Sequence, residues 1–174
     1  MSTSAPVRSQ QALVIGVFDL SGFLKAIREF DDARLSDVVD RVYTTIAEAV
    51  TGSGGRVVKY LGDGALAVWP SERADDAVVA AMAMRGRIVT VVDAFGLKSE
   101  MVCRFHHADV MAGEFGPDRG VDIMGGAVFT TFRLPARTIS VSVEAFRSLS
   151  PDTRRLLRKH TEPVVYIPVG DPRP

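Results

Sequence analysis

The sequence is poor in the features that mark secreted, membrane-spanning and nucleic-acid-binding proteins. It has one cysteine, Cys103, among 174 residues, which excludes an intrachain disulfide framework and suits a reducing compartment. No apolar run approaches the length of a membrane span, and the first ten residues lack the apolar core of a secretory signal. Lysine and arginine number 21, as do aspartate and glutamate, so bulk charge does not favour nucleic acid. We therefore expect a cytoplasmic protein that binds neither membranes nor nucleic acid.

The length and composition predict one globular domain. Apolar residues make up 47% of the chain, which is enough for a core without cross-links. No repeat or linker is visible. We expect residues 1–10 to form a disordered lead, residues 11–170 the domain and residues 171–174 a tail. Since no sensor is attached to this domain, we expect regulation through oligomerisation, small molecules or a partner chain.

Helical and strand patterns are interleaved along the chain. Apolar residues at helical spacing, with their stop signals, predict helices at 21–30, 34–50, 74–94, 125–137, 143–149 and 150–160. β-prone runs predict strands at 11–19, 56–61, 65–69, 100–107, 110–114, 138–143 and 164–169, with a turn at 106–109. This order predicts an α+β fold in which helices pack on a mostly antiparallel sheet.

Two aspartates end apolar runs. Gly62-Asp63-Gly64 is a tight turn between two β-prone runs, which predicts a hairpin, and Asp19 ends an earlier apolar run. Because buried strands of this kind are neighbours in a sheet, we expect both carboxylates at one sheet edge. Two carboxylates with phosphate oxygens and water suit Mg²⁺ or Mn²⁺. Ser21 is a candidate helix N-cap, and a helix N-terminus beside a metal is a place for phosphate.

Each of these features also has an ordinary structural interpretation. An isolated Asp-Gly is usually a turn, and an isolated Asp before Leu-Ser-Gly is usually a cap. The combination with Lys59, four residues before Asp63, is more specific. His106 and His107 are adjacent in a predicted strand and point to opposite faces, so we do not expect them to chelate one ion.

Three motifs, taken in order, resemble the class III nucleotidyl cyclases. They are Phe18-Asp-Leu-Ser-Gly-Phe23, Lys59-Tyr-Leu-Gly-Asp-Gly64, and Asp122-Ile-Met-Gly125 with Arg133 eleven residues after Asp122. The resemblance runs from about residue 13 to 137, and more loosely to 169. It implies a ferredoxin-like βααββαβ core. It also implies conversion of a nucleoside triphosphate, with ATP favoured, to a 3′,5′-cyclic nucleotide and pyrophosphate.

The resemblance assigns a metal and phosphate role to the first motif and to the hairpin turn. Two Mg²⁺ or Mn²⁺ ions would be held by Asp19, Leu20 and Asp63. The backbone amides of Ser21, Gly22 and Phe23 would grip the β- and γ-phosphates.

The resemblance assigns the base and the reacting phosphate to other residues. Lys59 and Asp122 would read the adenine edge, Arg133 would meet charge developing on the phosphate, and Lys159 is a loose match to a second phosphate-binding lysine. The family's transition-state asparagine falls on Phe129, whose ring cannot hydrogen-bond the ribose. Loss of such a contact costs about 10²–10³ in rate. A cyclase with a modified site, a slow cyclase and a nucleotide-binding domain without turnover all remain open.

Sites in this family form between two subunits, and this chain carries both halves. We therefore expect a head-to-tail homodimer with two equivalent sites. Adenylyl cyclase is the leading function. One alternative is a pyrimidine cyclase that makes cyclic UMP or CMP in antiphage signalling, and another is a non-catalytic dimerisation or nucleotide-sensing module. A cyclic dinucleotide synthase is disfavoured, because Gly62-Asp63-Gly64 supplies no adjacent acidic pair.

Overall fold

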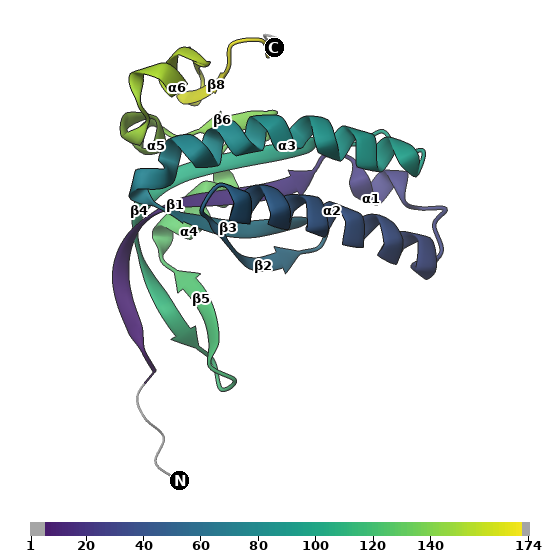
Figure 1. Ribbon diagram of the computed structural model, residues 1–174, viewed down its shortest axis with the longest axis horizontal. Coiled ribbons are helices and arrows are strands. Elements are labelled where there is room, and N and C mark those ends of the chain that lie inside the picture. The colour runs from purple at the N-terminus through teal and green to yellow at the C-terminus, as the bar shows by residue number, and fades with distance from the viewer. Residues whose placement is uncertain (1–5, 172–174) are drawn as a thin grey trace.

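The computed structural model describes residues 6–171. This part of the chain forms an α+β fold in which an eight-stranded, mostly antiparallel sheet carries two long helices on one face (Figure 1). The predicted fold class is confirmed. The first five residues of the predicted lead, and residues 172–174 of the predicted tail, lie outside the described residues.

The sheet has the order β2-β3-β1-β4-β6-β8-β7, and β5 pairs with β4 beside this path. Every pairing is antiparallel except that of β4 with β6. The first part, β2-β3-β1-β4, has the order expected of a ferredoxin-like core. The strands are β1 (Arg8–Leu20), β2 (Arg56–Leu61), β3 (Gly64–Pro70), β4 (Met101–Phe115), β5 (Gly120–Met124), β6 (Ile139–Val141), β7 (Leu157–His160) and β8 (Val165–Pro168).

Figure 1 shows α2 and α3 side by side over one face of the sheet. Asp31 caps α2 by accepting a hydrogen bond from the Arg34 N–H at 2.8 Å. Within residues 6–171, no helix is both long and apolar enough to cross a bilayer. The helices are α1 (Phe23–Ala26), α2 (Asp32–Gly52), α3 (Ala74–Ala94), α4 (Gly126–Arg133), α5 (Val143–Ser148) and α6 (Pro151–Arg155), with a 3₁₀ turn η1 (Ser71–Arg73).

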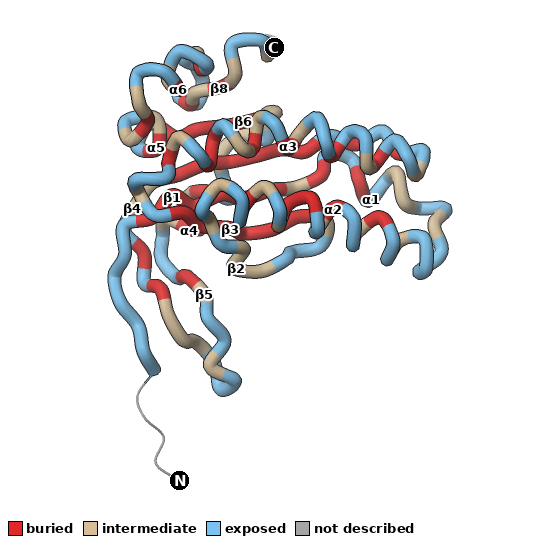
Figure 2. Tube along the Cα trace, viewed as in Figure 1, coloured by how far each residue is buried: buried red, intermediate tan, exposed pale blue. Residues whose placement is uncertain are grey.

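The two faces of the sheet have separate cores, and β1 contributes to both. Val14 and Phe18 belong to the large core under α2 and α3, whereas Ile15 and Val17 belong to a smaller core on the opposite face. Figure 2 shows the buried residues concentrated in the central strands, with exposed residues towards the free ends of β1, β4 and β5. Since side chains alternate along a strand, Asp19 lies on the same face as Ile15 and Val17. This is the face that the two long helices leave uncovered.

The predicted turn at 106–109 is wrong, because β4 is a single strand from Met101 to Phe115. It is paired with β1 over its length, from Arg8 opposite Gly113 to Leu20 opposite Met101. The strand β1 starts three residues earlier than predicted, so residues 8–10 of the predicted lead belong to the sheet. Residues 12–15 of β1 pair with residues 106–109 of β4 and satisfy their backbone, where we expected a break.

Three other segments differ from the prediction. The helix expected at 21–30 is only the single turn α1, which follows Gly22 with a positive φ of 71°. The helix expected at 150–160 ends at Arg155, because residues 157–160 pair with β8 as β7. The segment 120–124, for which no strand was predicted, is β5. The strands β5 and β7 each pair with a neighbouring strand across a short turn, and local patterns did not reveal these pairings.

Candidate active site

The turn between β2 and β3 packs directly on the end of β1. Gly62 has a φ of 60°, a conformation that glycine adopts without strain. A Cβ atom added to Gly64 would lie 1.9 Å from the carbonyl oxygen of Phe18, so only glycine allows this approach. As a result, Oδ2 of Asp63 accepts a hydrogen bond from the N–H of Leu20 at 3.1 Å. The second acid therefore lies beside the residue that follows Asp19.

The environment of Asp63 opposes its negative charge. Partial burial raises the pKa of its carboxyl, and the nearby carboxylate of Asp19 raises it further, while hydrogen bonds from backbone N–H groups lower it in part. Two carboxylates that repel each other are stabilised by a shared cation, and their hard oxygen donors fit Mg²⁺ or Mn²⁺. Within residues 6–171, no group of three or more His, Cys, Asp or Glu side chains suited to a metal occurs. Any ion here would need further oxygen ligands from the main chain, water or a phosphate.

A pocket of about 220 Å³ lies beside Asp19. Leu61 and Phe132 line it together with Arg104, a residue that the sequence did not lead us to select. Arg104 is only 9% exposed, and its Nε donates to the carbonyl oxygen of Leu134 at 3.0 Å. The sheet pairs it with Val17, which places it on the same face as Asp19. The available sequence signal was a single arginine inside an apolar strand, because such a cation needs a partner.

Only two of the three backbone amides predicted to bind phosphate are free of other hydrogen-bond partners among the described residues. The N–H of Ser21 donates to the carbonyl oxygen of Glu100 at 2.9 Å, so this amide is already bonded. The Oγ of Ser21 accepts from the N–H of Glu100 at 3.3 Å and does not cap α1, whose N-cap is Gly22. The N-cap prediction for Ser21 is therefore wrong. The amides of Gly22 and Phe23 have no hydrogen-bond partner among the described residues and are free to meet an anion.

The two predicted base-reading residues contact each other. The Nζ of Lys59, on β2, forms a hydrogen-bonded ion pair with Oδ2 of Asp122, on β5. The other oxygen of Asp122 accepts the N–H of Ile123 at 2.8 Å. The side chains of Lys59 and Asp122 are 41% and 20% exposed, so a ligand can reach the pair. A cationic donor and a carboxylate acceptor are thus held side by side.

The helix α4 presents two of the predicted residues to solvent. Phe129 is 67% exposed and Arg133, one turn later, is also exposed. Arg133 forms no ion pair or hydrogen bond with the part of the chain that the structure describes. Lys159 is exposed on β7, at the sheet edge opposite to β2 and away from the hairpin of Asp63. The structure therefore places Lys159 away from Asp19 and Asp63, and it leaves Phe129 and Arg133 exposed on α4, the helix whose Phe132 lines the pocket beside Asp19.

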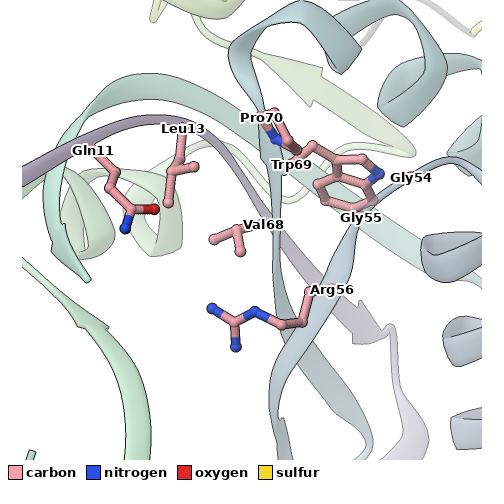
Figure 3. A pocket seen from close by; sticks show the side chains of 8 residues that line it. All are labelled: Gln11, Leu13, Gly54, Gly55, Arg56, Val68, Trp69 and Pro70. Carbon is pink, nitrogen blue, oxygen red and sulfur yellow. The ribbon is translucent and has the colours of Figure 1, made fainter. Parts of the chain in front are cut away.

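A second pocket, of about 230 Å³, lies near the other end of the same sheet face (Figure 3). Leu13, Val68, Trp69 and Pro70 are its apolar residues, and the side chains of Gln11 and Arg56 supply its polar groups. Asp19 lies six positions after Leu13 on β1, which is roughly 20 Å along an extended strand. This pocket contains no carboxylate, so it offers no acidic ligand for a cation.

Curated relatives of this chain are adenylate cyclases. Adenylate cyclase 2 of Rhizobium meliloti (strain 1021) is 26% identical over 161 residues, which cover 84% of this chain and 44% of that enzyme. The adenylate cyclase of Streptomyces coelicolor is 41% identical over 69 residues, which cover 40% of this chain and 17% of that enzyme. The chain thus spans less than half the length of either relative. No protein-family model matches it.

Solved structures of similar fold are also cyclases. The guanylyl cyclase Cya2 superposes with a TM-score of 0.80 and 20% identity, covering 95% of each chain. The adenylyl cyclase CyaB from P. aeruginosa superposes with a TM-score of 0.79 and 17% identity, covering 96% of this chain and 97% of that one. These similarities establish a shared fold.

Proposed function

We propose that the chain is a nucleotidyl cyclase acting on ATP, because it is related in sequence to the class III nucleotidyl cyclases and has their fold. Its motifs predicted both this relation and this fold. The products would be the 3′,5′-cyclic nucleotide and pyrophosphate. The observation that carries the proposal is the hydrogen bond from Leu20 to Asp63, which brings the second acid to the end of β1 beside Asp19.

In the proposed reaction the ribose 3′-oxygen attacks the α-phosphorus. A bond forms between these two atoms, the bond from the α-phosphorus to the bridging oxygen breaks, and pyrophosphate leaves. The barrier is mainly one of positioning and charge. The guanidinium of Arg104 and the amides of Gly22 and Phe23 supply positive potential for the triphosphate. Arg133 would oppose the charge that develops on the reacting phosphate.

Asp19 and Asp63, with the main chain of Leu20, would hold Mg²⁺ or Mn²⁺, two ions in each site. When bound, these ions lower the pKa of the attacking hydroxyl and neutralise triphosphate charge. The mutual repulsion of the two carboxylates supports this assignment, because a cation would relieve it. Lys59 would donate to a ring nitrogen of adenine, and Asp122 would accept from its exocyclic amine.

We further propose that the site is shared in a head-to-tail homodimer. One copy would supply Asp19, Asp63 and Arg104, and the other would supply the base-reading pair and α4. The exposure of Phe129 and Arg133 supports this arrangement, because neither has a role within its own chain. Two-fold symmetry would then create two equivalent sites.

A second candidate is a domain that binds nucleotide with little or no turnover. The specific observation in its favour is Phe129, a largely exposed ring at the position where the family carries a hydrogen-bonding asparagine. A pyrimidine cyclase also remains a candidate, because the edge of cytosine presents an acceptor beside a donor as adenine does.

Product analysis tests these functions directly. The protein is incubated with ATP, GTP, CTP or UTP and Mn²⁺, and the products are identified by mass spectrometry. If cyclic AMP is the main cyclic product of the wild-type protein and the Asp63→Asn variant forms none, the proposal is supported. Cyclic UMP or CMP in excess selects the pyrimidine cyclase. Nucleotide binding without any cyclic product, at high protein concentration, supports the non-catalytic module and contradicts the proposal.

A further inference from the structure

A tyrosine from α2 contacts the hairpin that carries Asp63. The hydroxyl of Tyr43 donates a hydrogen bond to the carbonyl oxygen of Gly62, the residue immediately before Asp63. Its ring stacks on Tyr60 of β2, with ring centroids 4.0 Å apart and planes 17° from parallel. The side chain of Tyr43 therefore meets the hairpin at two points, one on β2 and one on the turn.

The turn has few other fixed contacts. Gly62 and Gly64 have no side chains, and the carboxylate of Asp63 is bonded to the N–H of Leu20. Within residues 6–171, Tyr43 is the one side chain from another element that hydrogen-bonds the main chain of residues 62–64. A peptide group that can rotate would move the Asp63 carboxylate with it. The Tyr43 hydroxyl restrains that rotation from the side of α2.

The surroundings keep Tyr43 in its donating form. Burial raises the pKa of its hydroxyl, and the negative charge of Asp63 and the neighbouring Tyr60 raise it further. The phenol is therefore protonated at neutral pH and can donate to Gly62.

We propose that Tyr43 is a positioning residue for the metal-binding carboxylate of Asp63. This inference rests on the proposed function. The hydroxyl fixes the Gly62 carbonyl, and thereby the orientation of the peptide from which the Asp63 side chain projects. Lys59 lies on the same hairpin but is held separately by Asp122. The inference therefore concerns metal use and leaves base recognition unaffected.

The variant Tyr43→Phe keeps the ring and its stacking and removes only the donor. A matched control is Tyr166→Phe, because Tyr166 on β8 also stacks, with its ring centroid 3.5 Å from that of Phe146, and lies across the sheet. We expect the half-saturating Mn²⁺ concentration to rise about three- to tenfold in Tyr43→Phe, as the loss of one hydrogen bond implies. The KM for ATP at saturating Mn²⁺ and the melting temperature should stay close to wild type.

Amide hydrogen exchange in the full chain separates this role from a general loss of stability. Faster exchange confined to residues 61–65 in Tyr43→Phe, without change in Tyr166→Phe, supports the proposal. Unchanged exchange there, or an unchanged Mn²⁺ requirement, overturns it. A global increase in exchange, with kcat and KM altered together, also overturns it. If the wild-type protein forms no cyclic nucleotide, the proposed function fails, while the exchange result still decides whether Tyr43 fixes the turn.

Discussion

Lys59 and Asp122 are bonded to each other across β2 and β5, although 63 residues separate them along the chain. The pair is formed within one chain. An ammonium group has three donors, and a carboxylate has several acceptor positions, so both partners keep hydrogen-bonding capacity after they pair. A base that offers an acceptor beside a donor can therefore add to the pair without separating it.

Replacing Asp122 by alanine is expected to weaken ATP recognition. The KM for ATP should rise about 10- to 100-fold, because a charged hydrogen-bond acceptor is lost and Lys59 is no longer held in place. The cost to folding should stay below about 1 kcal/mol, because the pair is partly exposed. Steady-state kinetics and thermal unfolding measure the two effects, with Asp118→Ala in the exposed loop as the control. A KM within twofold of wild type would contradict the assigned role.

Replacing Phe129 by asparagine is expected to increase activity. An asparagine would restore the polar group that Phe129 lacks, and restoring one such contact can gain about 10²-fold in kcat. No core contact is lost, because the ring is 67% exposed. The rate of cyclic AMP formation measures the gain, and Val79→Asn, at an exposed apolar position on α3, controls for added polarity. Equal rates in wild type and Phe129→Asn would indicate that another group already does this work.

Replacing Asp63 by asparagine should abolish metal-dependent activity and stabilise the fold at neutral pH. The pKa of Asp63 is raised in the folded state, by burial first and then by Asp19, so folding disfavours its charged form. That penalty is present above the folded pKa and disappears as the pH falls below the unfolded value of 3.8.

The melting temperature of Asp63→Asn should therefore exceed that of wild type at pH 7.5, and the difference should vanish near pH 3.5. Differential scanning fluorimetry at both pH values measures it. Added Mn²⁺ should raise the melting temperature of wild type and leave that of the variant unchanged. A variant less stable than wild type at pH 7.5 would refute the electrostatic argument.

Mixing two inactive variants tests the shared site. Asp19→Ala removes the metal side and Arg133→Ala removes the phosphate-facing residue on α4, so each homodimer should be inactive. A mixed dimer would contain one site with both defects and one intact site. Activity should recover to about one quarter of wild type, since half of the dimers are mixed and each has one working site. Mixtures that stay inactive after subunit exchange, followed by product formation, would exclude the shared arrangement.

The spacing of apolar residues predicted the helices and strands that bury one continuous apolar face. Residues 74–94 form α3 with the predicted bounds, because alanine and methionine at helical spacing define a packing surface. The hairpin around Asp63 was predicted from its two glycines and β-prone flanks, and the structure contains it. The strands β5 and β7 and the continuity of β4 were missed, because pairing with other strands decides their conformation.

Site residues that belong to a sequence motif could be predicted, whereas site residues that are brought together only by packing could not. Asp63 and Lys59 followed from a short turn motif with characteristic spacing. Arg104 became a candidate only when the register with Val17 placed it on the face of Asp19. The contact of Tyr43 with Gly62 joins a helix to a turn nineteen residues later, and no spacing rule connects them.

The β2–β3 hairpin carries Lys59 on the strand and Asp63 at the tip. In the proposed dimer these two residues would serve different catalytic centres, one reading the base in the first and the other holding cations in the second. A subunit with a displaced hairpin would then inactivate both catalytic centres of any dimer that it joins. Such an allele would be dominant over a normal copy in the same cell, whereas loss of Arg133 alone would leave one centre of a mixed pair working.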